Sequence, residues 1–185
     1  MKTQERLAFI TEIAKRDTHN LGKTGMMKFL YLLQTIYKVP LGYEFEIYTY
    51  GPYCQTVMSD IEYAEFADCI QVKPITYPSG LSGYSINAKQ TDNKVLDNTT
   101  DIIHEYSRQI DEVIASFSEK SAKELELYST IVFVTSSFYQ NSWGKEKGEI
   151  CKTVKGIKPH FSNDTICEAY DDLDTHKFLD AIEIK

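Results

Sequence analysis

The sequence predicts a mostly helical α+β protein, in which a winged-helix-like N-terminal module with a small antiparallel sheet precedes a helical C-terminal module. Two observations predict this class. Apolar and polar residues alternate with the period of two that is typical of strands, and this pattern is confined to residues 43–87. After residue 100, apolar residues recur at helical spacing. We place the first module at residues 1–90 and the second, for which a winged helix is again an alternative, at residues 98–185.

The first module begins with two predicted helices, over residues 3–15 and 24–37. The second helix is apolar over more than half its circumference, so it should be the central helix of the core. Further along, the segments IQVKPIT and GYSI indicate two short strands around a turn rich in Gly, Ser and Pro. Helix, helix, strand, helix and hairpin together resemble a winged-helix arrangement.

The stretch YEFEIYTYGPYC, residues 43–54, lies between the second helix and that hairpin. Its alternation predicts a half-buried strand with Phe45 and Ile47 facing the core. Proline at the first helical position costs no hydrogen bond, so Pro52 is expected to open a third helix that continues to Ala67.

The second module follows a polar connector, NAKQTDNKVLDNTT, in which Val95 and Leu96 could form a helical turn. A capping box in SAKE and an N-cap at Ser162 mark the starts of two of its helices. The final segment FLDAIEI is a candidate strand. The predicted helices cover residues 100–117, 124–139, 145–155 and 163–175.

The charge balance distinguishes the two halves of the chain. Residues 1–90 hold nine basic and nine acidic residues, whereas residues 91–185 hold eleven and eighteen, so the net charge of −7 comes from the second half. An acidic total disfavours nonspecific binding to nucleic acid. The chain has no signal-peptide pattern and no apolar run long enough for a membrane span, and its four cysteines form no CxxC pair. We therefore expect a cytoplasmic protein with reduced thiols.

A family resemblance covers most of the chain. The segment KFLYLLQ, residues 28–34, followed by YGPY, residues 50–53, resembles the uncharacterised bacterial YwgA-like proteins and, more distantly, the Panacea or SocA-like antitoxin domain. The later segments ELELYSTIVF and KPHFSNDTICEAYDDL also resemble the YwgA-like proteins, whereas the Panacea match covers only the first half. Gly25, Met26 and Met27 depart from the K-L-Q that opens the Panacea helix. The Panacea resemblance implies binding to a toxin, or delivery of a toxin to a protease, whereas the YwgA-like resemblance implies no activity.

The aromatic stretch is the candidate partner-binding site. Tyr48, Tyr50 and Tyr53 have the chemistry that is enriched in protein interfaces, and the alternative is a packed corner between a strand and a helix. A basic face around Lys23 and Lys28 could touch a nucleic-acid backbone, although a solvated face is the simpler interpretation. The predicted partner-binding residues are Lys28, Tyr48, Tyr50, Gly51, Pro52 and Tyr53.

Motifs of catalysis and metal binding are missing from the sequence. The four histidines have no zinc-ligand spacing, and neither a GxSxG elbow nor a phosphate-binding P-loop occurs. The acidic run CEAYDDLD, residues 167–174, fits the solvated face of a helix. We therefore expect no enzyme activity, no cofactor and no metal.

Together these features predict a non-enzymatic protein-interaction module of bacterial or phage origin, with an antitoxin or adaptor role. The expected partner is a protein, such as a toxin or a second copy of the chain. The alternative is a winged-helix DNA-binding transcriptional regulator. Its recognition helix would begin at Pro52, yet that segment carries Asp60, Glu62 and Glu65, with Asp68 directly after it, and no Lys or Arg.

Overall fold

The computed structural model describes residues 1–19, 21–76, 80, 82–89, 94–144 and 146–183. Over these residues the protein is mostly helical with two small antiparallel sheets, which confirms the predicted α+β class. The elements are α1 (Thr3–Arg16), α2 (Lys23–Thr35), β1 (Glu46–Tyr48), β2 (Gly51–Tyr53), α3 (Gln55–Phe66), β3 (Ile70–Thr76), β4 (Ser82–Ala88), the 3-10 turn η1 (Lys94–Leu96), α4 (Thr100–Glu105), α5 (Ser107–Phe117), α6 (Ala122–Gln140), α7 (Lys147–Ile157), α8 (Asn163–Thr175) and α9 (Phe178–Glu183).

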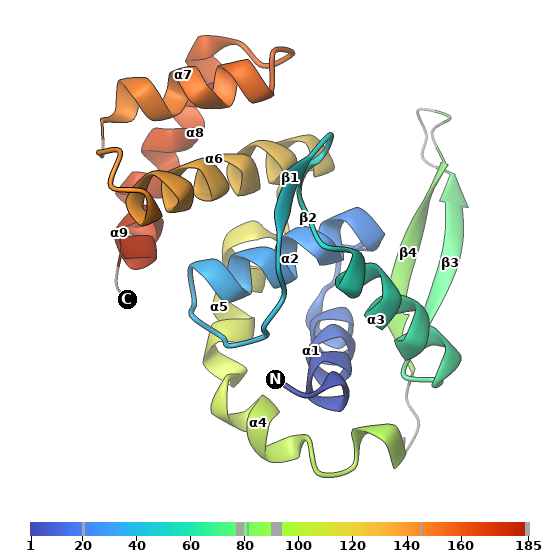
Figure 1. Ribbon diagram of the computed structural model, residues 1–185. Coiled ribbons are helices and arrows are strands. Elements are labelled where there is room, and N and C mark those ends of the chain that lie inside the picture. Colours follow the sequence, from blue (N-terminus) through green and yellow to red (C-terminus); the bar gives the residue numbers. More distant parts are fainter. Residues whose placement is uncertain (20, 77–79, 81, 90–93, 145, 184–185) are drawn as a thin grey trace.

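Helix α6 crosses the middle of the molecule (Figure 1). Helices α7, α8 and α9 pack on it, and so do α2 and strand β2 from the first half of the chain. Helices α4 and α5 contact α1, and α5 also contacts α2. The buried apolar residues form one hydrophobic cluster that takes members from both predicted modules. Helix α2 is central to it, as its pattern predicted, with eight buried residues.

The N-terminal elements follow the predicted order with one correction. Strands β3 and β4 pair antiparallel from Ile70 opposite Ala88 to Thr76 opposite Ser82, as expected for the hairpin, although most of its predicted turn lies outside the described residues. The prediction that Pro52 opens a helix is wrong. Pro52 belongs to β2, where it pairs with Ile47, and α3 begins only at Gln55.

The two strands that contain this proline form a separate two-stranded sheet, β1 with β2. Gly51 has φ of +88°, a backbone conformation that suits glycine, and it returns the chain antiparallel to β1. A proline is tolerated in such a pair because an edge strand does not need every backbone donor. A second strand therefore occupies Gly51–Tyr53, where the sequence indicated the start of a helix.

Local capping signals in the second half are confirmed. The backbone N–H of Ser121 donates to Glu124 Oε2 at 2.8 Å, and Ser121 accepts from the backbone N–H of Glu124, which completes the capping box of α6. Ser162 accepts from the backbone N–H of Thr165 at 3.1 Å and so caps α8. The turn expected near Val95 is present as η1.

Two predictions for the second half are wrong. The single helix over residues 100–117 is divided into α4 and α5, because Tyr106 leaves helical geometry at ψ of 14°. The terminal segment predicted as a strand is the helix α9. It buries Leu179 and Ile182, which are one helical turn apart, and packs on α6 and α8.

Candidate functional site

Strands β1 and β2 with their turn, residues 46–53, form what we call the tyrosine hairpin. Tyr48 and Tyr50 are 68% and 65% exposed, and Tyr53 is half-buried with its ring 5.7 Å from that of Tyr48. As residues of a partner surface the three tyrosines are expected to be at least partly exposed, and this expectation is confirmed. Phe45 precedes the hairpin and packs against the core, with its ring 5.0 Å from that of Tyr31 of α2, so the prediction that it faces the core is confirmed. Phe45 and Ile47 are nevertheless half-buried rather than buried.

A buried lysine from the second half of the chain holds the turn of the hairpin. Lys158, which directly follows α7, is 1% exposed, and its Nζ donates to the backbone oxygens of Tyr48, at 3.4 Å, and Thr49. The same ammonium lies 2.9 Å from Glu126 Oε1 of α6, whose side chain is 10% exposed. His160 Nε2 lies 3.4 Å from that carboxylate oxygen, on the solvent side.

A second buried lysine, from the first half, holds strand β2. Lys28 of α2 is 2% exposed and donates from Nζ to the backbone oxygen of Pro52 at 2.5 Å. Burial lowers its pKa from 10.5 to about 8; the neighbouring Lys158 lowers it further and Glu126 partly offsets the change. The interpretation of Lys28 as part of a solvated basic face is therefore wrong, because the central helix directs this residue inward at the hairpin.

A pocket of about 220 Å³ opens between the tyrosine hairpin and helices α2 and α3. Its walls combine aromatic rings and two methionines with two lysines. It contains five of the six residues predicted to bind a partner; the sixth, Pro52, is buried and does not line it. The lining residues are Lys23, Thr24, Met27, Lys28, Tyr48, Tyr50, Gly51, Tyr53 and Met58.

The sequence interpretation missed Glu126 and Lys158. A signal existed for Glu126, which stands between two leucines in the most apolar helix of the chain, where a solvated carboxylate is unexpected. The sequence contains no such signal for Lys158, because its burial depends on the backbone of Tyr48, which lies 110 positions away. Gly51 and Pro52 are both buried, so they shape the hairpin rather than form its outer surface.

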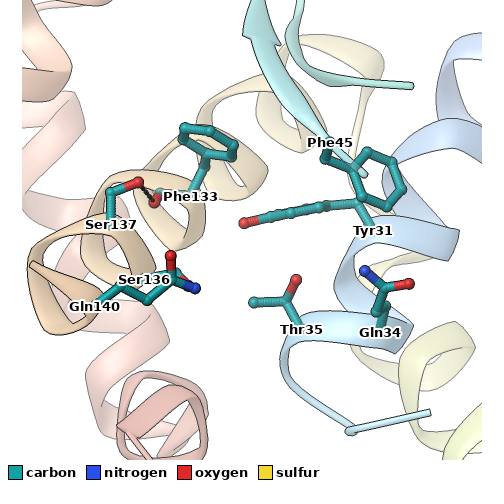
Figure 2. A pocket seen from close by; sticks show the side chains of 8 residues that line it. All are labelled: Tyr31, Gln34, Thr35, Phe45, Phe133, Ser136, Ser137 and Gln140. Carbon is teal, nitrogen blue, oxygen red and sulfur yellow. Dashed lines mark hydrogen bonds between the residues drawn. The ribbon is translucent and has the colours of Figure 1, made fainter. Parts of the chain in front are cut away.

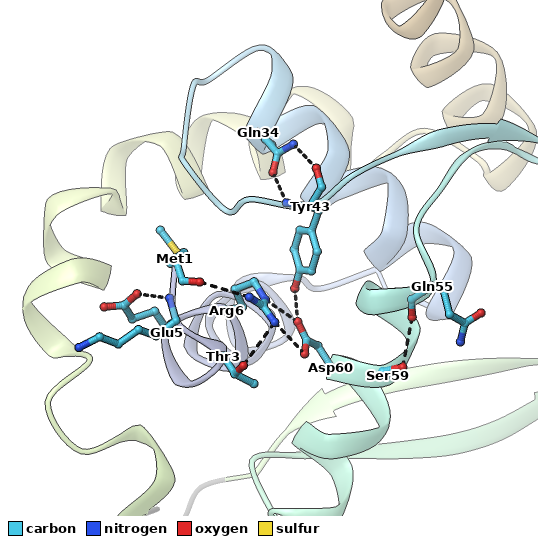
Figure 3. Close-up of polar contacts among 10 residues, drawn as sticks. Met1, Thr3, Glu5, Arg6, Gln34, Tyr43, Gln55, Ser59 and Asp60 are labelled. Atoms are coloured by element: carbon cyan, nitrogen blue, oxygen red, sulfur yellow. Dashed lines mark hydrogen bonds and ion pairs between the residues drawn. The ribbon is translucent and has the colours of Figure 1, made fainter.

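A polar network beside α3 serves the fold (Figure 3). Asp60 is 5% exposed, accepts from Arg6 Nε at 2.7 Å and from the Tyr43 hydroxyl at 2.8 Å, and so is not on the outer acidic face of α3. Burial, and then the charge of Asp60, raises the pKa of Tyr43. Gln34 binds both the backbone N–H and the backbone oxygen of Tyr43 at 2.9 Å, which fixes the segment that leads to the hairpin.

A second pocket of about 220 Å³ lies between α2 and α6 (Figure 2). Figure 2 shows side chains of α6, among them Phe133, facing Tyr31 and Thr35 of α2 across the pocket. Its lining carries hydroxyls, amides and aromatic rings, and none of the lining residues is charged. Gln34 is committed to the backbone of Tyr43, so the polar groups that the lining leaves for a ligand come from Tyr31, Thr35, Ser136, Ser137 and Gln140.

The described residues contain no group of three or more His, Cys, Asp or Glu side chains arranged to hold a metal ion. All four cysteines are free thiols, and three are buried. The acidic run on α8 has the predicted orientation: Ile166, Ala169, Tyr170 and Leu173 face inward. Across the described part of the chain, no helix combines the length and apolar character needed to span a membrane.

Comparisons with known proteins add no assignment. A scan of protein-family models, a search of curated proteins and a search of solved structures each found no match. The YwgA-like and Panacea resemblance therefore stays a prediction from the sequence segments that carry it.

Proposed function

We propose that this protein is a non-enzymatic interaction module of bacterial or phage origin that binds a protein partner in the cytoplasm. The tyrosine hairpin and the pocket beside it are the binding surface. The most specific form of the proposal is an antitoxin or adaptor, which rests on the Panacea resemblance of the first half of the chain.

One observation carries this proposal: two largely exposed tyrosines project from a turn whose backbone is fixed by buried charged groups. Tyr48 and Tyr50 are 68% and 65% exposed, while Lys158 binds the backbone oxygens between them from below. Exposed aromatic side chains are common hot spots of protein interfaces. A turn that is already ordered loses less conformational entropy when a partner binds, so more of the contact energy appears as affinity.

The competing function is a winged-helix DNA-binding regulator with α3 as its recognition helix. Helix α3 has no Lys or Arg, and Glu62 on its surface is exposed, so its outer face would repel phosphate groups. Burial of Asp60 removes one acid from that face without adding a base. These charges favour a protein partner over DNA.

The test compares two tyrosine variants. Proteins that co-purify with the tagged chain in its native host are identified by mass spectrometry, produced in pure form, and titrated calorimetrically; sedimentation of the chain alone tests self-association. Tyr50→Ala should weaken binding of the purified partner by about 2 kcal/mol, which is about 30-fold. Tyr63→Ala is the matched control, because Tyr63 is 47% exposed on α3 and does not line the pocket.

Equal affinity of the Tyr50→Ala variant and the unmodified chain would show that the hairpin is not the binding surface. A salt-dependent shift of random duplex DNA at micromolar protein would instead favour the DNA-binding alternative.

A further inference from the structure

The buried charges behind the tyrosine hairpin are unbalanced. Lys28 and Lys158 are 2% and 1% exposed, and Glu126, at 8%, is the buried carboxylate that faces them. These three side chains therefore sum to one positive charge. His160 does not correct the excess, because protonation of its half-exposed ring would add positive charge. A buried charge without a counter-charge is costly, so an anion that reaches this region is stabilised.

The pocket beside the hairpin borders this charge, because Lys28 is one of its lining residues. Lys28 and Lys23 both line the pocket, and the Nζ of Lys23 lies 5.0 Å from the ring centre of Tyr84, outside the lining. Helix α2 begins at the same place, and its N-cap, Gly22, has no side chain to cap the first turn. The positive end of the helix dipole therefore adds to the potential of the two lysines.

The other walls of the pocket are mostly apolar. Met27 and Met58 contribute thioether side chains, which adapt to irregular apolar groups, and the hairpin tyrosines contribute aromatic rings. The volume of about 220 Å³ suits one residue rather than a long segment. A single residue that combines an apolar side chain with a carboxylate is the C-terminal residue of a polypeptide.

We propose that this pocket binds the C-terminal residue of the partner protein, with an apolar side chain between the methionines and the terminal carboxylate facing Lys28 and Lys23. The proposal rests on the function proposed above and names the part of the partner that enters the site. An internal Asp or Glu side chain would need a second, apolar residue in the same volume.

The experiment uses the methionine methyl groups as reporters. The chain has four methionines. Met27 and Met58 line the pocket, whereas Met26 lies in the core at 0% exposure and Met1 is outside the pocket, so these two are internal controls. The chain labelled with ¹³C at its methionine methyls is titrated with N-acetyl-phenylalanine and, separately, with N-acetyl-phenylalanine amide. The acid should shift the signals of Met27 and Met58 with at least tenfold higher affinity than the amide.

A lysine variant tests the charge itself. Lys28→Met keeps the length of the side chain and leaves Lys158 paired with Glu126, so the preference for the acid should fall below twofold while the amide still binds. Lys73→Met, at an exposed position of β3, should keep the full preference.

Each other outcome overturns a defined part of the proposal. Equal affinities of the unmodified chain for the acid and the amide would contradict recognition of the carboxylate. If neither probe shifts the signals of Met27 and Met58, the pocket is not the binding site. Both results are obtained with the unmodified chain, so they do not depend on the folding of Lys28→Met. N-acetyl-Phe-Asp amide binding as tightly as the acid would show an internal acidic segment in place of a C-terminus. The Tyr50→Ala titration with the whole partner decides the proposed function independently.

Discussion

The buried ammonium of Lys28 makes a prediction about stability that depends on pH. Folding lowers the pKa of Lys28 from 10.5 to about 8, mainly because the side chain loses water. The perturbation is Lys28→Met, which removes the titrating group and retains most of the side chain's volume. The quantity to compare is the free energy of unfolding of the variant minus that of the unmodified chain, as a function of pH.

The sign follows from proton binding. Between the folded pKa of about 8 and the unfolded value of 10.5, the unfolded chain holds the proton on Lys28 and the folded chain does not. Stability of the unmodified chain therefore rises with pH in this window relative to the variant. The free energy of unfolding of the variant minus that of the unmodified chain should therefore fall by about 2 kcal/mol between a pH of about 7.5 and a pH of about 10.

Urea denaturation followed by circular dichroism at several pH values measures this difference. Groups that titrate in both proteins cancel, including Cys151, whose pKa burial raises from 9.0 to about 12. The pH-dependent part of the hydrogen bond to Pro52 is already included in the folded pKa of Lys28, so the loss of this bond adds only a constant offset. Lys73→Met provides a constant difference as a control. A difference for Lys28→Met that stays constant with pH would refute the reasoning, because it would mean that Lys28 titrates alike in both states.

Three further substitutions test the fold by urea denaturation at neutral pH. Phe45→Ala should cost about 2 kcal/mol, less than a fully buried phenylalanine, and a cost above about 4 kcal/mol would contradict its half-buried position. Gly51→Ala should cost more than about 1 kcal/mol because φ is +88° and a Cβ would lie 3.1 Å from Thr130 Oγ1; an unchanged stability would exclude this geometry. Asp60→Ala should cost about 3 kcal/mol because Arg6 loses its partner, and a cost below about 1 kcal/mol would show that the pair is solvated.

The parts of the fold that the sequence predicted correctly have local causes. Ser121 with Glu124, and Ser162 with Thr165, satisfy helix ends within a few residues of each other, so their signals are visible in short segments. The inner face of α8 was also predicted from the sequence, because thirteen residues are enough to show a helical period.

The wrong predictions arose where one local pattern fits two structures. A proline is compatible with the first turn of a helix and with an edge strand, and only the φ of Gly51 and the pairing with Ile47 decide for the strand. The six residues of α9 are too few to distinguish a helical from an extended period. The exposed tyrosines were predicted from alternation, but the burial of Lys28 depends on Pro52, which is distant in sequence.

The contacts of the two buried lysines indicate that these residues serve to fix the position of the tyrosine hairpin more than to add stability to the fold. Replacing a buried ion pair with apolar groups is often neutral or stabilising, so stability alone gives little reason to bury Lys158 with Glu126. Apolar side chains, however, cannot donate to the backbone oxygens of Tyr48 and Thr49, which Lys158 binds. Lys28, from the first half of the chain, likewise donates to the backbone oxygen of Pro52 in strand β2. The hairpin is therefore held at two points by residues that converge only in the folded protein, and a partner that reads Tyr48 and Tyr50 would also be sensitive to the integrity of α6 and α7.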